Sequence, residues 1–121
     1  MAANMLVDTH CHLQLPEFDS DREEVLRRAR RAGLDAFVVP GTDVETSRAA
    51  LTLADSQPDI YAAVGVHPHD ADSFNGRTMP ALRSLANSSR TVAIGEIGLD
   101  YYRNLSPPDA QRQVFRHMLD L

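Results

Sequence analysis

Four short apolar runs recur along the chain about 30 residues apart, and each is followed by polar residues and a helical pattern of apolar side chains. This alternation is the repeat of βα units, which assemble into a parallel sheet. The predicted strands are residues 5–7, 34–39, 60–66 and 91–94. The predicted helices are residues 21–32, 44–56, 79–87 and 107 onward.

Residue types at the starts of these helices support their placement. Ser20 and Glu23 have the spacing of a capping box, in which a hydroxyl and a carboxylate satisfy free backbone N–H groups. Thr42 and Glu45 repeat this spacing before the second helix. Ser106, followed by two prolines, is the predicted cap of the last helix.

The chain is predicted to be a single partial domain, residues 1–121. Gly33 alone separates the first predicted helix from the next strand, so the connections are as short as βα repeats require. Four βα units are half of a (β/α)8 TIM barrel, which typically needs ~250 residues, and a doubly wound sheet is the competing architecture. The last helix keeps its apolar spacing to the final residue. We therefore expect the chain to be the N-terminal half of a longer, truncated barrel.

Composition limits the classes of function. The chain is 43% hydrophobic and 24% charged, which is typical of a globular domain with a packed core. Its formal net charge of -5 argues against a basic face for nucleic acid, so a phosphodiester substrate needs bound metal for positive charge. Cys11 is the only cysteine, and the N-terminus lacks the pattern of a signal peptide. No apolar run approaches the ~20 residues of a membrane span, so we expect a cytoplasmic protein without a membrane role.

Two histidines and a carboxylate follow the first predicted strand. Asp8, His10 and His12 alternate along the chain, so an extended backbone points all three to one face. Two imidazoles on one face can share a divalent ion through neutral nitrogens, with Asp8 as a ligand or as the group that fixes a tautomer. The alternative is a pair of surface or hydrogen-bonded core histidines. Cys11, on the other face, is predicted to be a small buried apolar residue.

Glu96 follows the fourth predicted strand, between Gly95 and Gly98. An isolated charge is costly after a buried strand, so this carboxylate is predicted to bind a cation. A carboxylate can also bridge two metal ions ~3.5–4 Å apart, the arrangement used for in-line displacement at phosphorus. The alternative is an exposed glutamate paired with an arginine.

The third predicted strand leads into Gly65-Val66-His67-Pro68-His69. The glycine allows a close backbone approach, and the proline fixes the turn between the two imidazoles. His67 and His69 are the candidate substrate-binding residues: His67 could contact a phosphate or a ligand-bound water, and His69 could instead brace the loop. Three of the four strands thus end in chemically active side chains, which favours the barrel because its catalytic groups come from several strand ends.

Together and in this order, the three segments resemble the TatD family of metal-dependent deoxyribonucleases, relatives of the amidohydrolase superfamily with a TIM-barrel fold. The most specific part is residues 95–102, Gly-Glu-Ile-Gly-Leu-Asp-Tyr-Tyr. The resemblance implies that His10 and His12 bind one metal and that His67 lines the substrate pocket. It implies that Glu96, as the catalytic residue, binds or bridges a pair of Mg2+, Mn2+ or Zn2+ ions that activate water for hydrolysis of DNA, often from the 3′ end.

The remaining ligands of the family, two histidines and an aspartate from later strands, have no position in this chain. We therefore expect the 121-residue chain by itself to bind metal weakly and to have little or no nuclease activity. We also expect the unpaired edges of a half barrel to promote self-association. No protein partner is evident in the sequence.

Two other functions stay open. A barrel of the amidohydrolase type that cleaves amides or esters would also begin with His-x-His on its first strand, although residues 95–100 argue against it. The second is an inactive fragment, or pseudoenzyme, that binds a partner through its exposed edge.

Overall fold

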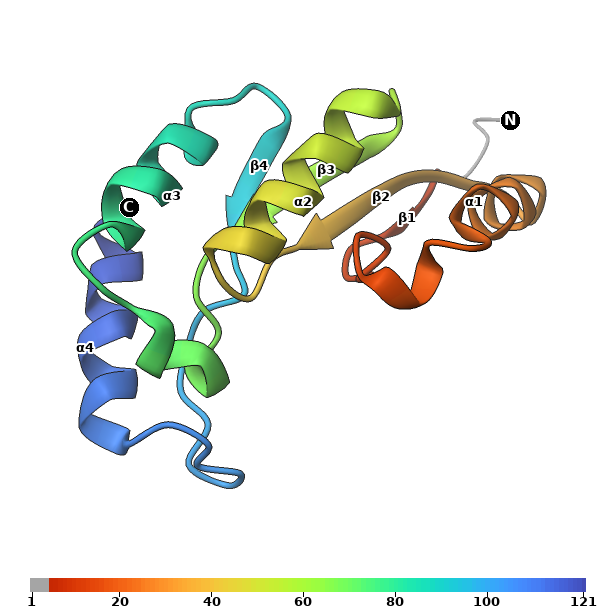
Figure 1. Ribbon diagram of the computed structural model, residues 1–121. Helices are drawn as coiled ribbons and strands as arrows, with labels where there is room; N and C mark the ends of the chain where they lie inside the picture. Colours follow the sequence, from red (N-terminus) through yellow and green to blue (C-terminus); the bar gives the residue numbers. More distant parts are fainter. Residues whose placement is uncertain (1–4) are drawn as a thin grey trace.

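The computed structural model describes residues 5–121. Its centre is a four-stranded parallel sheet with the order β1-β2-β3-β4, and helices connect and follow the strands (Figure 1). The strands are β1 (Leu6–Asp8), β2 (Leu34–Pro40), β3 (Ile60–Val64) and β4 (Thr91–Ile94). The helices are α1 (Arg22–Arg31), α2 (Val44–Ser56), α3 (Thr78–Ala86) and α4 (Pro108–Leu119). Two short 3-10 helices, η1 (Pro16–Phe18) and η2 (Pro68–Ser73), were not predicted.

The strand order distinguishes the two predicted architectures. Each strand pairs in parallel with the next one along the chain; Phe37 of β2, for example, lies beside Ile60 of β3. Successive βα units of a barrel give this sequential order, whereas a doubly wound sheet reverses its order at a switch point. The prediction of consecutive βα units is confirmed, and the described sheet has no switch point.

Two apolar clusters hold the helices against the sheet. Leu26 of α1 packs with Phe37 of β2 and Ile60 of β3 in the first cluster. Leu82 of α3 and Met118 of α4 belong to the second. All five side chains are buried, and burying an aliphatic or aromatic side chain contributes roughly 1.5–3 kcal/mol. The apolar spacing that predicted the helices is therefore the spacing that builds the core.

The capping box of α2 lies one position later than predicted. Asp43 is the N-cap: its carboxylate accepts the Thr46 N–H at 2.8 Å, and the Thr46 hydroxyl accepts the Asp43 N–H at 3.0 Å. Thr42 cannot begin the helix because its carbonyl accepts the N–H of His67 at 2.8 Å, which ties Thr42 to the loop after β3. The predicted pair of Thr42 and Glu45 is therefore wrong.

The other two predicted caps are also wrong. Asp21, not Ser20, is the N-cap of α1, and it makes no side-chain cap hydrogen bond, since the chain enters α1 directly after η1. Pro107 is the N-cap of α4. The hydroxyl of Ser106 donates instead to the carbonyl of His69 at 2.8 Å, so it joins two loops and does not cap the helix.

The ends of the elements match the prediction within a few residues. Gly33 follows α1 with a φ of +100°, which glycine adopts without the strain a Cβ would cause, and it separates α1 from β2 as predicted. β3 ends at Val64, two residues earlier than predicted, because the Gly65 N–H donates to the Ser47 hydroxyl at 3.2 Å and leaves the strand ladder. α4 ends at Leu119 and does not continue to the final residue.

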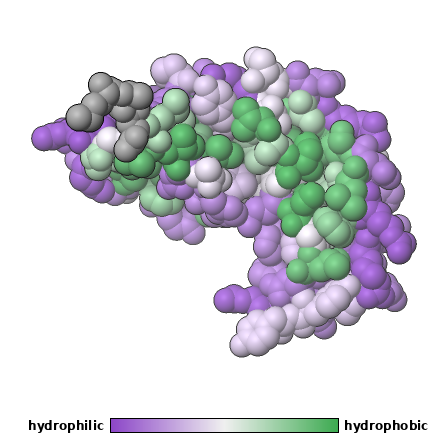
Figure 2. Space-filling view, turned by 180° about the vertical axis from the view of Figure 1, so that it is seen from behind, coloured by the Kyte–Doolittle hydropathy of each residue, from purple (hydrophilic) through white to green (hydrophobic). Residues whose placement is uncertain are grey.

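The sheet face opposite α2 exposes apolar side chains. Figure 2 looks onto the molecule from this side and shows a band of hydrophobic residues across it. Leu6 and Val7 of β1 and Val92 of β4 are 52%, 44% and 53% exposed. β1 and β4 are the outer strands, so each has one edge without a neighbouring strand among the described residues.

No helix within residues 5–121 combines the length and the apolar character needed to cross a membrane. The prediction of no signal peptide concerns the N-terminus, where residues 1–4 lie outside the described residues. The predicted domain bounds, residues 1–121, include the same four residues and stay a prediction.

Candidate metal centre

A turn, not an extended strand, delivers His10 and His12 to the carboxyl end of the sheet. β1 ends at Asp8, whose Oδ1 accepts the His10 N–H at 3.0 Å, and the Cys11 N–H then donates to the Val38 carbonyl at 3.2 Å. The prediction that Asp8 shares one strand face with both histidines is wrong, because its carboxylate holds this turn and stays outside the donor cluster. The two imidazoles nevertheless meet, with their Nε2 atoms 3.2 Å apart.

Glu96 reaches the same place from β4. Its N–H donates to the Gly41 carbonyl at 2.8 Å. The preceding N–H, of Gly95, donates to the Val64 carbonyl at 3.0 Å, so the segment after β4 crosses the ends of β3 and β2. Gly65 permits the crossing, because a Cβ there would lie only 3.0 Å from the Glu96 carbonyl oxygen. The close backbone approach predicted at Gly65 is confirmed.

His10, His12 and Glu96 form a cluster of metal-ligating atoms. His10 Nε2 lies 3.4 Å from Glu96 Oε1, and His12 Nε2 lies 3.1 Å from Glu96 Oε2. Two ligands ~2.1 Å from a tetrahedral ion are about 3.4 Å apart, so the spacing of the donors fits one divalent ion. Imidazole nitrogens together with a carboxylate are a common donor set for zinc, and carboxylate oxygen also suits manganese and magnesium.

A backbone carbonyl fixes the tautomer of the His12 ring. Nδ1 of His12 lies 3.1 Å from the Pro40 carbonyl oxygen, so Nδ1 carries the proton and Nε2 keeps its lone pair for a metal. Asp8 was a candidate for this role, and the Pro40 carbonyl performs it instead. The His10 side chain is 54% exposed and that of Glu96 is 22% exposed, so the cluster opens to solvent beside β1.

His67 faces the cluster from the loop after β3. Its Nε2 lies 3.9 Å from Glu96 Oε1, and its Nδ1 accepts the N–H of His69 at 3.0 Å. Because Nδ1 acts as an acceptor, the neutral ring carries its proton on Nε2. Burial lowers the pKa of His67, and the nearby Glu96 partly opposes this, so the neutral ring is favoured. His67 therefore offers the site an N–H donor.

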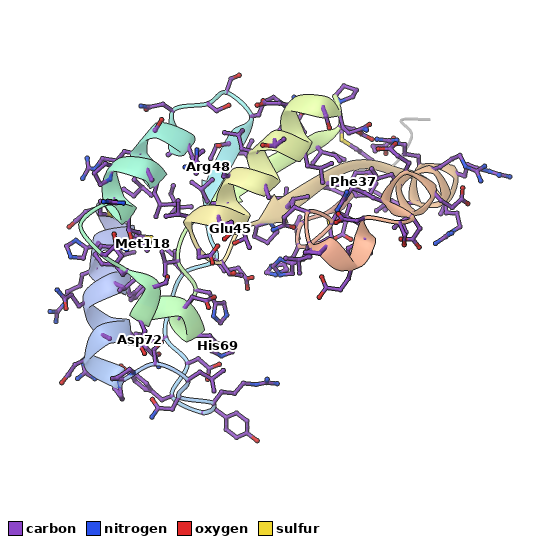
Figure 3. All side chains as sticks on the ribbon, in the orientation of Figure 1. Phe37, Glu45, Arg48, His69, Asp72 and Met118 are labelled. Carbon is purple, nitrogen blue, oxygen red and sulfur yellow. The ribbon has the colours of Figure 1, made fainter. Side chains whose placement is uncertain are left out.

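His69 pairs with Asp100 and does not join the donor cluster. His69 Nε2 lies 2.5 Å from Asp100 Oδ2. Figure 3 shows His69 and Asp72 on η2, beside the loop after β4 and the start of α4. This arrangement agrees with a bracing role for His69, while its contact with substrate stays a prediction.

Gln111 was not singled out by the sequence, and Asp100 was noted only as part of residues 95–102, without a role of its own. Gln111 of α4 is fully buried and makes three hydrogen bonds to the loop before the helix. Its place in the sequence carried a signal, because Gln111 falls on the apolar stripe of α4 with Val114 and Met118. A polar side chain on such a stripe needs buried hydrogen-bond partners.

Cys11 lies outside the cluster of metal-ligating atoms. The thiol packs against the first apolar cluster, and Sγ donates to the Val38 carbonyl at 3.5 Å. Burial, with a smaller contribution from Asp8, raises the pKa of Cys11 to about 12. The thiol therefore stays protonated near neutral pH. Cys11 is half-buried, so the prediction of a buried apolar residue is met only in part.

Sequence comparisons agree with this geometry. A family-wide sequence model described as "TatD related DNase" matches residues 7–121. Curated relatives include the uncharacterized metal-dependent hydrolase YabD of Bacillus subtilis (strain 168), 40% identical over 117 residues. They also include the 3'-5' ssDNA/RNA exonuclease TatD of Erwinia tasmaniensis, 42% identical over 117 residues. These matches cover 97% and 96% of this chain but 46% and 45% of the relatives, so the chain spans about half of their length.

Solved structures of TatD-related proteins have the same fold as this chain. YJJV, a TatD homolog from Escherichia coli k12, matches with a TM-score of 0.86 and 32% identity over 95% of this chain and 45% of that one. A TatD family hydrolase from Entamoeba histolytica also gives a TM-score of 0.86, at 24% identity over 96% of this chain and 45% of that one, which supports the fold alone. The four βα units are those of a TIM-barrel fold, of which this chain supplies about half. The chain belongs to the family of TatD-related DNases.

Proposed function

We propose that the protein is a hydrolase that cleaves phosphodiester bonds of DNA with divalent metal ions and works from the 3′ end. The cluster of His10, His12 and Glu96 carries this proposal, because its donor atoms, from the segments after β1 and β4, lie 3.1 to 3.4 Å apart. Catalytic groups of (β/α)8 enzymes lie at the carboxyl ends of their strands, where this cluster is found. The exonuclease name of the Erwinia tasmaniensis relative supports the choice of substrate.

Each candidate residue has a role in this reaction. His10 and His12 hold the metal through Nε2, and Glu96 is the catalytic carboxylate that binds it. A bound divalent ion supplies the positive charge for phosphate and makes water more acidic. His67 donates its Nε2–H to a phosphate oxygen. His69 contacts His67 and is therefore assigned to the substrate-binding part of the site.

We infer that the complete site uses two ions, of Mg2+, Mn2+ or Zn2+. One oxygen of Glu96 faces His12, and the other faces both His10 and His67. Glu96 has two oxygens, so it can bind the ion of this cluster with one of them and a second ion with the other. The three donors of this cluster suffice for one ion only, so a second ion needs donors beyond them.

We also infer that the protein works in the cytoplasm. Cys11 is the only cysteine of the chain, so the chain has no intrachain disulfide. Structural disulfides are characteristic of oxidising compartments, and a fold that uses none is suited to a reducing one.

The test of function uses the protein at the length that its gene encodes. We expect a single-stranded DNA labelled at its 5′ end to shorten from the 3′ end with Mg2+ or Mn2+, and EDTA to stop the reaction. A panel of cyclic amides and esters runs beside the DNA. Hydrolysis of an amide or ester without hydrolysis of DNA would establish the amidohydrolase alternative in place of the nuclease.

The isolated 121-residue chain is expected to self-associate, because Leu6, Val7 and Val92 expose apolar surface beside two open strand edges. Val92→Lys should shift the chain toward monomer in sedimentation velocity, since charge on an edge strand opposes pairing. Leu119→Lys is the matched control, because Leu119 is also exposed but lies on α4. A well-folded monomer of the unaltered chain at high concentration would contradict this proposal.

A further inference from the structure

Two residues of the loop after β4, Asp100 and Ser106, fasten it to the loop after β3 through three hydrogen bonds. His69 Nε2 lies 2.5 Å from Asp100 Oδ2. The Ser106 hydroxyl donates to the His69 carbonyl at 2.8 Å and accepts the Asp72 N–H at 3.3 Å. Ser106 is 1% exposed, so this second contact is shielded from water. The two loops therefore form one unit at the carboxyl end of the sheet.

Asp100 is held in place from three directions. Its Oδ1 accepts the N–H groups of Tyr102 at 3.1 Å and Arg103 at 3.0 Å. Gln111 accepts the Asp100 N–H at 2.8 Å and donates to the Asp100 carbonyl at 3.1 Å. The N–H of Arg103, followed by the bond with His69, holds the pKa of Asp100 below its usual value. Asp100 is thus ionised and its Oδ2 is held in a fixed position, where it pairs with His69.

His69 in turn determines the state of His67. The His69 N–H donates to His67 Nδ1 at 3.0 Å, and the two rings pack edge to face with centroids 4.3 Å apart. The hydrogen bond requires a lone pair on His67 Nδ1, and the ring contact limits rotation of the imidazole. The Nε2–H of His67 is thereby directed toward Glu96, 3.9 Å away.

We propose that Asp100 and His69 are positioning residues that fix His67 as an Nε2–H donor beside the metal cluster. The proposal rests on the proposed function, in which that donor meets a phosphate oxygen. Among the described contacts, Asp100 itself touches none of the three candidate metal ligands. It acts through His69, whose Nε2–H it accepts, and His69 acts on His67 through its backbone N–H and its ring. A donor that meets charge developing on the phosphoryl group affects kcat more than KM.

The first measurement is the tautomer of each histidine in the protein at its encoded length, read from long-range 1H–15N spectra. We expect His67 to carry its proton on Nε2 and His69 to carry its proton on Nε2 toward Asp100. In Asp100→Asn the new amide group faces His69 Nε2, so the proton of His69 should move to Nδ1. A His67 proton on Nδ1, or an unchanged His69 in Asp100→Asn, would overturn the proposal.

The second measurement is the kinetics of DNA hydrolysis by the same protein. We expect Asp100→Asn and His69→Ala to lower kcat about 10- to 100-fold, the usual scale for residues that orient a ligand, with little change in KM. His69→Gln should recover part of the loss, because its amide can still donate to Asp100. Asp109→Asn is the control, since Asp109 is exposed on α4 and pairs only with Arg112 among the described contacts.

The two measurements separate failure of the inference from failure of the proposed function. Asn at position 100 keeps an oxygen for the N–H groups of Tyr102 and Arg103, so the loop retains its cap in this variant. Unchanged kcat in Asp100→Asn and His69→Ala overturns the positioning role. An unaltered protein without activity on DNA refutes the proposed function, and the tautomer spectra then still decide whether His67 carries its proton on Nε2 and whether Asp100 sets the tautomer of His69.

Discussion

Glu96→Gln is expected to abolish metal-dependent DNA hydrolysis by the protein at its encoded length, with a loss of at least about 10³-fold, the scale seen when a member of a catalytic unit is removed. Glutamine keeps the size of the side chain but removes the negative charge that faces His10 and His12 at 3.4 and 3.1 Å. It also removes one of the two oxygens that can bind metal. Activity and metal content after desalting should therefore fall together.

Glu17→Gln serves as the matched control for this variant. Glu17 is exposed in η1, so the substitution removes the same charge from a surface position. The control should keep both metal and activity. Undiminished DNA hydrolysis by Glu96→Gln, in a preparation free of contaminating nuclease, would show that Glu96 is neither the catalytic carboxylate nor a required ligand.

The 121-residue chain on its own is expected to lose its metal on desalting and to degrade DNA at least about 10³-fold more slowly than a complete barrel of this family. His10, His12 and Glu96 supply three donors, and His10 is more than half exposed. An open set of three donors holds a single ion loosely and leaves a two-metal site without enough ligands. Metal analysis of the desalted chain and a DNA assay with Mn2+ check the two parts of this prediction.

The matching variant for this second prediction is Glu96→Ala in the 121-residue chain. Rapid Mg2+- or Mn2+-dependent degradation of DNA by the chain, abolished in Glu96→Ala, would contradict the prediction and show that three donors suffice. Activity that survives in Glu96→Ala would instead point to a contaminating nuclease. A folded chain without metal or activity would agree with the alternative of an inactive fragment.

The apolar pattern predicted the fold well because it records burial directly. Leu26, Ile60 and Leu82 fall where the periodicities of helix and strand require, and all three are buried between the helices and the sheet. The sites at the strand ends were predictable for a related reason. Parallel strands bring their carboxyl ends together, so His10, His12 and Glu96 could be expected to meet although the sequence separates them widely.

The details that the sequence did not predict depend on contacts between loops. Asp8 looked like a ligand by its spacing, but its carboxylate holds a turn that no periodicity describes. Asp43 replaced Thr42 as the cap of α2 because the Thr42 carbonyl is bonded to the loop after β3. Asp100 and Gln111 depend in the same way on where one loop meets another. These contacts form between segments that are distant in the sequence, so local sequence patterns do not predict them.

The space beside Gly65 affects the candidate metal centre, although Gly65 is not one of its donor residues. The missing side chain lets the segment after β4 pass so close that an added Cβ would lie 2.9 Å from Ile97 Cγ2 and 3.0 Å from the Glu96 carbonyl oxygen. A side chain at position 65 would therefore have to displace the backbone that carries Glu96. Cations of different radius require different ligand spacings. We therefore expect a single methyl group at position 65 to change which cation the candidate metal centre prefers, although none of its three donor residues is exchanged.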